Sequence, residues 1–151
     1  MNLTESGEIV EWPEARYVFV ERTGVIPKVA PEAWQMAIGL VPQLSKKSQI
    51  TWRMSLYRMK PDVYRAGFVV AEAPLELPAG MQYELIGGGK YSRFVLTGPY
   101  SDLPAATRRV FEIMAERGTA LRSEFCVESY VSDPRTTPEA DLVTEILIPT
   151  A

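Results

Sequence analysis

Short apolar runs rich in β-branched and aromatic residues recur along this chain between glycines and prolines, and they predict a protein built mainly from β-strands. Successive side chains of a strand lie on opposite faces of its sheet. The first such stretch, residues 9–21, is broken at Trp12-Pro13-Glu14, because proline cannot donate a hydrogen bond to a neighbouring strand. The remaining strands are expected at residues 50–59, 64–71, 82–86, 90–96, 125–131 and 142–148.

Apolar residues at helical spacing predict a first helix that begins near Pro31. Pro31 suits a first turn, where an N–H group would have no partner inside the helix, and Pro42 is expected to end or bend the last turn. The apolar face of this helix is expected to comprise Trp34, Ile38 and Val41.

A second helix is expected after Asp102, which is a good N-cap residue, and before Gly118, which is well placed as a C-terminal stop. Charged residues lie outside its apolar stripe, as on a helix that covers a sheet. The stripe comprises Leu103, Ala106, Val110, Ile113 and Met114.

The order strand, helix, strand, strand occurs twice, on either side of the linker-like residues 73–80. Thr23-Gly24 precedes Thr97-Gly98 by 74 positions, and residues 53–61 align with residues 126–134 at an offset of 73. We therefore expect an α+β fold: a tandem βαββ repeat with pseudo-twofold symmetry, an antiparallel sheet and two main helices. Residues 1–151 are expected to form a single domain, with repeat one at about 1–75 and repeat two at about 76–151.

The composition is that of a globular protein, with 46% hydrophobic and 23% charged residues. No apolar run approaches the ~20 residues that cross a bilayer, and residues 1–8 lack the basic-then-apolar order of a signal peptide. Cys126 is the single cysteine, so no internal disulfide can form. These features favour a cytoplasmic protein that has no membrane partner.

The chain contains no histidine, which excludes a Ser-His-Asp or Cys-His site and any histidine-bound metal or haem. A zinc site made of thiolates is excluded by the single cysteine. We therefore expect no cofactor and no metal. The net charge of −3 argues against direct binding of nucleic acid.

The candidate site centres on Glu128, a lone carboxylate in an otherwise apolar strand. One face of this strand is suited to packing under a helix and comprises Phe125, Val127, Ser129 and Val131; the other comprises Cys126, Glu128 and Tyr130. The aligned strand of the first repeat places Arg53, Ser55 and Tyr57 on the corresponding face. Two interpretations follow: a ligand cavity at the repeat junction lined by Glu128, Tyr130, Ser55 and Tyr57, or a Glu128 that is exposed on the sheet or paired with Arg53.

Several motifs resemble those of GyrI-like small-molecule-binding domains, which are grouped with SOUL-like proteins. They are Gly-Gly-Lys-Tyr at 88–91, Thr-Gly-Pro-Tyr at 97–100, Val-Glu-Ser-Tyr at 127–130, Asp-Pro at 133–134 and residues 144–149. These bacterial domains also serve as effector-binding modules of AraC-type and MerR-type regulators. The first half departs from the family pattern at residues 58–61, where the family has a glycine and an Asp-Pro turn.

The resemblance implies a ligand site at the repeat junction, with Glu128 facing lipophilic, often cationic drugs or toxins among aromatic rings. A subset of such domains resembles hydrolases that open the cyclopropane ring of DNA-alkylating natural products, which would make Glu128 and Tyr130 catalytic. Besides Tyr57 and Ser55, the further candidates for the pocket and its aromatic cage are Trp52, Trp12, Tyr91 and Cys126.

Three functions from different classes follow. The first is a stand-alone, multidrug-type binding protein for a small organic ligand, and the second is the cyclopropanoid hydrolase. The third is a protein-interaction role, such as inhibition of a topoisomerase, which leaves open a protein partner or a homodimer.

Overall fold

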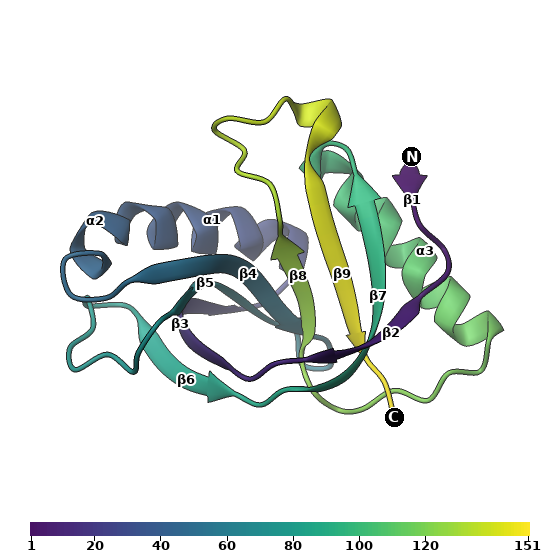
Figure 1. Cartoon of the computed structure of the whole chain (residues 1–151), viewed down its shortest axis with the longest axis horizontal. Helices are drawn as coiled ribbons and strands as arrows, with labels where there is room; N and C mark the ends of the chain where they lie inside the picture. The colour runs from purple at the N-terminus through teal and green to yellow at the C-terminus, as the bar shows by residue number, and fades with distance from the viewer. The chain divides into compact units, whose positions relative to one another are not determined.

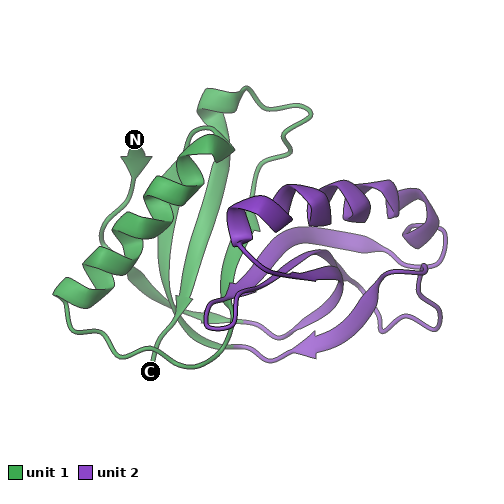
Figure 2. Cartoon of the chain, turned by 180° about the vertical axis from the view of Figure 1, so that it is seen from behind, with its two compact units in different colours: residues 1–12, 89–151 green, residues 13–88 purple.

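The computed structural model describes residues 1–151, and its strands and helices are labelled in Figure 1. The chain divides into two compact units, which Figure 2 shows in separate colours: unit 1 comprises residues 1–12 and 89–151, and unit 2 comprises residues 13–88. Each unit has an antiparallel sheet and one long helix that lies across it. The predicted α+β fold with two main helices is therefore confirmed. No helix has both the length and the apolar character needed to cross a membrane.

Unit 2 has four antiparallel strands in the order β4-β5-β3-β6. Four consecutive residues of β3, Tyr17 to Val20, are buried, so both faces of this sheet are covered. In chain order the elements are β3 (Ala15–Thr23), α1 (Ile26–Gly39), α2 (Val41–Leu44), β4 (Ile50–Arg58), β5 (Val63–Val70) and β6 (Gln82–Ile86).

Unit 1 has the strand order β2-β7-β9-β8, and a short β1 also pairs with β7. Helix α3 lies across this sheet (Figure 2) and buries all five residues of the predicted stripe. The elements are β1 (Asn2–Leu3), β2 (Glu8–Trp12), β7 (Gly89–Thr97), η1 (Tyr100–Asp102), α3 (Leu103–Glu116), β8 (Cys126–Tyr130), η2 (Glu139–Asp141) and β9 (Val143–Pro149).

The order strand, helix, strand, strand occurs once in each unit, as β3-α1-β4-β5 and as β7-α3-β8-β9. The edge strands, however, are exchanged between the halves of the sequence. Strand β2 comes first in the chain but pairs with β7 of unit 1, and β6 follows the linker but pairs with β3 of unit 2. The compact units therefore do not coincide with residues 1–75 and 76–151.

Helix α1 differs from its prediction at its start and on its buried face. It begins at Ile26 rather than near Pro31, because Pro27 occupies the first turn and the amides of Lys28 and Val29 bond to the carbonyl of Val25. Pro31 lies inside the helix. On its buried face, Ala33 and Ala37 are fully buried, whereas Ile38 of the predicted face is 61% exposed.

The other helix ends lie close to the prolines and glycines that predicted them. Helix α1 ends at Gly39, and Pro42 lies in the first turn of the short α2. Helix α3 ends at Glu116, with Gly118 at a φ of 63° just beyond it, as a C-terminal stop requires. Asp102 precedes α3 as predicted, but its side chain makes no capping hydrogen bond, because a 3-10 turn already leads into the helix.

Candidate functional site

Glu128 lies in the middle of β8, which is the last strand in the unit 1 order. Its side chain is partly buried, and its Oε1 accepts a hydrogen bond of 2.9 Å from the hydroxyl of Tyr130. Burial raises the pKa of Glu128, and the hydrogen bond from Tyr130 opposes this with a smaller effect. No arginine or lysine of unit 1 forms an ion pair with Glu128. Its negative charge is therefore poorly compensated within its own unit.

The tyrosine that bonds to this carboxylate is packed against a second tyrosine. The ring of Tyr100 meets the ring of Tyr130 edge-on, with centroids 5.5 Å apart and planes inclined by 67°. Tyr100 belongs to η1, the turn that leads directly into α3. The face of β8 that carries Cys126, Glu128 and Tyr130 is therefore the face toward α3. The prediction that Val127 and Ser129 pack under the helix is wrong, because alternation fixes the two sets of residues but not which set meets the helix.

The residue of unit 2 that corresponds to Glu128 is neutral, and its side chain is hydrogen-bonded. Ser55, which aligns with Glu128, is buried in β4, and its Oγ accepts a hydrogen bond of 2.9 Å from Nε1 of Trp34. The same indole N–H lies 2.8 Å from the hydroxyl of Tyr64, which is 2.6 Å from Ser55 Oγ. Trp34 comes from α1, so this hydroxyl cluster joins the helix to two neighbouring strands.

Tyr57 lies close to this cluster. It is buried in β4 directly opposite Tyr64 of β5, and residues that are opposite across a strand pair share a face. Tyr57, Ser55 and Tyr64 therefore all lie on the α1 side of the unit 2 sheet. Within unit 1, Glu128, Tyr130 and Cys126 therefore share a face of β8. Within unit 2, Ser55 and Tyr57 share a face of β4.

The other predicted cage residues lie elsewhere within their units. Tyr91 is buried in β7 opposite Pro149, on the sheet face away from Glu128, and the guanidinium of Arg122 lies 5.0 Å from its ring. Burial raises the pKa of Tyr91. Trp12 ends β2, which is separated from β8 by β7 and β9, or roughly 14 Å at the usual strand spacing. Trp52 is 39% exposed and lies on the opposite face of β4 from Ser55.

Three residues of these clusters were not predicted as site residues: Tyr100, Trp34 and Tyr64. Tyr64 could have been found, since a tight turn at residues 60–62 places it opposite Tyr57 in a hairpin. Tyr100 follows Thr97-Gly98-Pro99, and only the path of the chain into α3 brings it to Tyr130. Trp34 was predicted on the apolar face of its helix. Nothing in the sequence indicates which polar group its indole N–H would bind.

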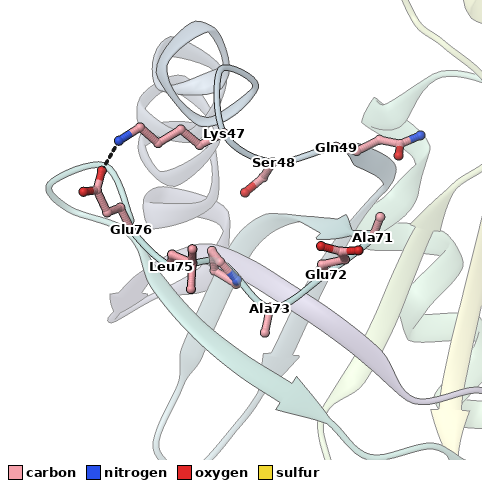
Figure 3. Close-up of a pocket in the computed structure, with 9 residues that line it drawn as sticks. Lys47, Ser48, Gln49, Ala71, Glu72, Ala73, Leu75 and Glu76 are labelled. Carbon is pink, nitrogen blue, oxygen red and sulfur yellow. Dashed lines mark hydrogen bonds and ion pairs between the residues drawn. The ribbon is translucent and has the colours of Figure 1, made fainter.

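A separate hollow of about 570 Å³ lies on unit 2 between residues 47–49 and 71–76 (Figure 3). The ion pair between Lys47 and Glu76 lies at its rim. Its walls contain no aromatic residue, and Glu72 adds a second carboxylate. Because it lacks aromatic rings, this hollow does not have the character of the predicted aromatic cage.

The chain is a member of the family of GyrI-like small molecule binding domains, whose model matches residues 6–151. The predicted family is therefore confirmed. No curated protein sequence matches this chain.

Solved structures share this fold at low sequence identity. The C-terminal domain of EcmrR has a TM-score of 0.74 at 16% identity, with 99% of this chain and 97% of that domain covered. In the EcmrR–DNA complex, this chain covers 57% of the EcmrR chain at a TM-score of 0.69 and 17% identity. SAV2435 bound to tetraphenylphosphonium has a TM-score of 0.68 at 14% identity, with 100% and 94% covered. A hydrolase from Listeria innocua has a TM-score of 0.61 at 14% identity, with 95% and 91% covered.

Proposed function

We propose that this protein binds lipophilic organic cations and that Glu128 is the counter-ion for the bound ligand. The observation that carries the proposal is the state of this carboxylate: it is partly buried, burial raises its pKa, and no cationic side chain of its unit pairs with it. A carboxylate in such a position gains most from a partner that brings its own positive charge. A ligand cation would favour the ionised form that burial disfavours.

Aromatic neighbours fit the same class of ligand. Tyr130 donates a hydrogen bond to Glu128, and its ring packs against that of Tyr100. A cation over an aromatic face gains roughly 0.5–2 kcal/mol. The family to which the chain belongs binds small molecules, and one protein of the same fold was solved with tetraphenylphosphonium, a lipophilic cation. These facts support a small organic cation as ligand.

Further roles of the site residues are also predicted. That Ser55 and Tyr57 contribute to the same ligand site as Glu128 stays a prediction. Cyclopropane hydrolysis by Glu128 and Tyr130, and inhibition of a topoisomerase, also stay predictions, because no contact within either unit separates these roles from binding alone.

Titration calorimetry with two related compounds tests the proposal. Tetraphenylphosphonium carries a positive charge, whereas triphenylphosphine oxide is neutral and presents similar phenyl rings. Removing one member of a buried charge pair costs about 2–5 kcal/mol, so we expect Glu128→Gln to weaken tetraphenylphosphonium binding by about 30-fold or more. Binding of triphenylphosphine oxide should change by less than about threefold, because it needs no counter-ion.

Glu139→Gln is the matched control, since Glu139 is an exposed carboxylate of the same unit. It removes the same charge from the molecule and should leave both affinities unchanged. Equal tetraphenylphosphonium affinities for wild type and Glu128→Gln would place Glu128 outside the ligand site and contradict the proposal.

A further inference from the structure

Thr144 has a buried hydroxyl group that the structure leaves without a hydrogen-bond partner. The residue lies in β9 and has no solvent-exposed surface. Across the sheet it lies directly opposite Leu96 of β7 on one side and Tyr130 of β8 on the other. Thr144 therefore belongs to the same layer of side chains as the Glu128–Tyr130 pair.

Such a hydroxyl is unusual in a folded protein. The large majority of buried side-chain polar atoms have a hydrogen-bond partner, either in the protein or in an ordered water. Valine has the same shape as threonine without the hydroxyl, so packing alone does not require a threonine at this position. The Thr144 hydroxyl thus keeps a donor and an acceptor that the protein itself does not use.

The register brings this hydroxyl close to the candidate site. Tyr130 and Thr144 are direct cross-strand neighbours, whereas Glu128 is opposite Ile146 and is therefore the diagonal neighbour of Thr144. Diagonal neighbours have Cα atoms about 7–8 Å apart and lie within reach of long side chains. A water that bridges two polar groups is almost as favourable as a direct hydrogen bond.

We propose that Thr144 is a specificity-determining residue of the Glu128 site. Its hydroxyl accepts a hydrogen bond from the ligand, directly or through one buried water, and thereby selects cations that carry an N–H or O–H group. This inference rests on the proposed function, because it assumes that Glu128 binds the ligand's positive charge. It adds a second polar contact, which discriminates among cations that Glu128 alone would treat alike.

Two triarylmethyl dyes form a matched pair of probes. Pararosaniline and crystal violet are cations of similar shape, but pararosaniline carries three NH₂ groups where crystal violet carries dimethylamino groups without any N–H. We expect Thr144→Val to weaken pararosaniline binding by about fivefold to tenfold, the effect of one hydrogen bond. Crystal violet binding should change by less than about twofold, and Thr144→Ser, which keeps the hydroxyl, should retain the preference for pararosaniline.

Thr150→Val is the matched control, since Thr150 has another buried hydroxyl without a partner. It lies six positions further along the chain, roughly 20 Å away in an extended strand, beside Lys90. This variant should leave both dye affinities unchanged. An unchanged pararosaniline affinity in Thr144→Val, or an equal loss for both dyes, would overturn the role of Thr144. If wild-type protein binds neither dye, or if Glu128→Gln binds both as tightly as wild type does, the proposed function fails instead.

Discussion

Glu128 is a carboxylate whose charge is costly where it lies, and this cost should be visible in the stability of the protein. In the unfolded chain its pKa has the ordinary value for glutamate, whereas burial raises it in the folded state. A raised pKa means that the folded state binds the proton more tightly than the unfolded state. The carboxyl group therefore contributes its full stability below the ordinary pKa, and this contribution is lost as the pH rises through the raised pKa.

A comparison of wild type with Glu128→Gln at several pH values tests this sign. Glutamine stays neutral, so the free energy of unfolding of the variant lacks the contribution of this group. We expect the variant to gain stability relative to wild type as the pH rises from about 4 to about 8, by about 1.4 kcal/mol for each unit of the pKa shift. Urea unfolding measures both free energies. A difference that is constant over this range, or that shrinks as the pH rises, would contradict a raised pKa.

At the scale of single residues, the sequence shows which carboxylate is special but not what surrounds it. Glu128 stands out because it interrupts an otherwise apolar strand, and such a group needs a partner. Its hydrogen bond from Tyr130 depends on side-chain rotamers, and the packing of Tyr100 against Tyr130 depends on the path of a turn. The hydroxyl cluster of Trp34, Ser55 and Tyr64 depends on how close α1 lies to the sheet, which no local pattern encodes.

At the scale of elements, Gly67 shows how closely β5 approaches its neighbour in unit 2. A Cβ atom built on Gly67 would lie 2.3 Å from the backbone oxygen of Val18 and 2.8 Å from Cβ of Phe19. The obstacles are backbone and near-backbone atoms of β3, which cannot rotate away. We expect Gly67→Ala to lower the free energy of unfolding by about 1–3 kcal/mol, the usual cost of overpacking. Chemical denaturation of the variant measures this loss.

Gly39→Ala is the matched comparison for this prediction. Gly39 is the last residue of α1, and a Cβ atom there would meet nothing within 4 Å. Alanine is favoured over glycine in helices by about 0.5–1 kcal/mol, so this variant should be as stable as wild type or slightly more stable. If both variants lost the same stability, the close approach of β5 to β3 would not be the cause.

Most element boundaries could be predicted, because prolines, glycines and alternation act locally. The start of α1 could not, since both Pro27 and Pro31 are acceptable first-turn residues and only tertiary packing decides between them. The predicted buried face of α1 was right at Trp34, which contacts β4 and β5, and wrong at Ile38, which is exposed. The small side chains of Ala33 and Ala37, which were not predicted on this face, are buried there.

At the scale of the whole molecule, the repeat was visible in the sequence but the exchange of its edge strands was not. Pairing of β2 with β7 joins residues about 80 positions apart, as Glu8 opposite Arg93 shows. Neither strand carries a local signal for its partner, because an edge strand can add to any free edge of suitable length. The order of elements follows from local patterns, whereas the composition of each sheet follows from long-range contacts.

The central claim, that Glu128 is the counter-ion of a bound cation, can be tested most directly by following the protonation of this one carboxyl group. Carbon-13 NMR of the Glu128 side-chain carboxyl during a pH titration, without and with saturating tetraphenylphosphonium, measures its pKa in both states. We predict a pKa above the ordinary value of about 4.3 in the protein alone. The pKa should fall when tetraphenylphosphonium binds, because a nearby positive charge stabilises the carboxylate. A pKa that is the same with and without the bound cation would contradict the account.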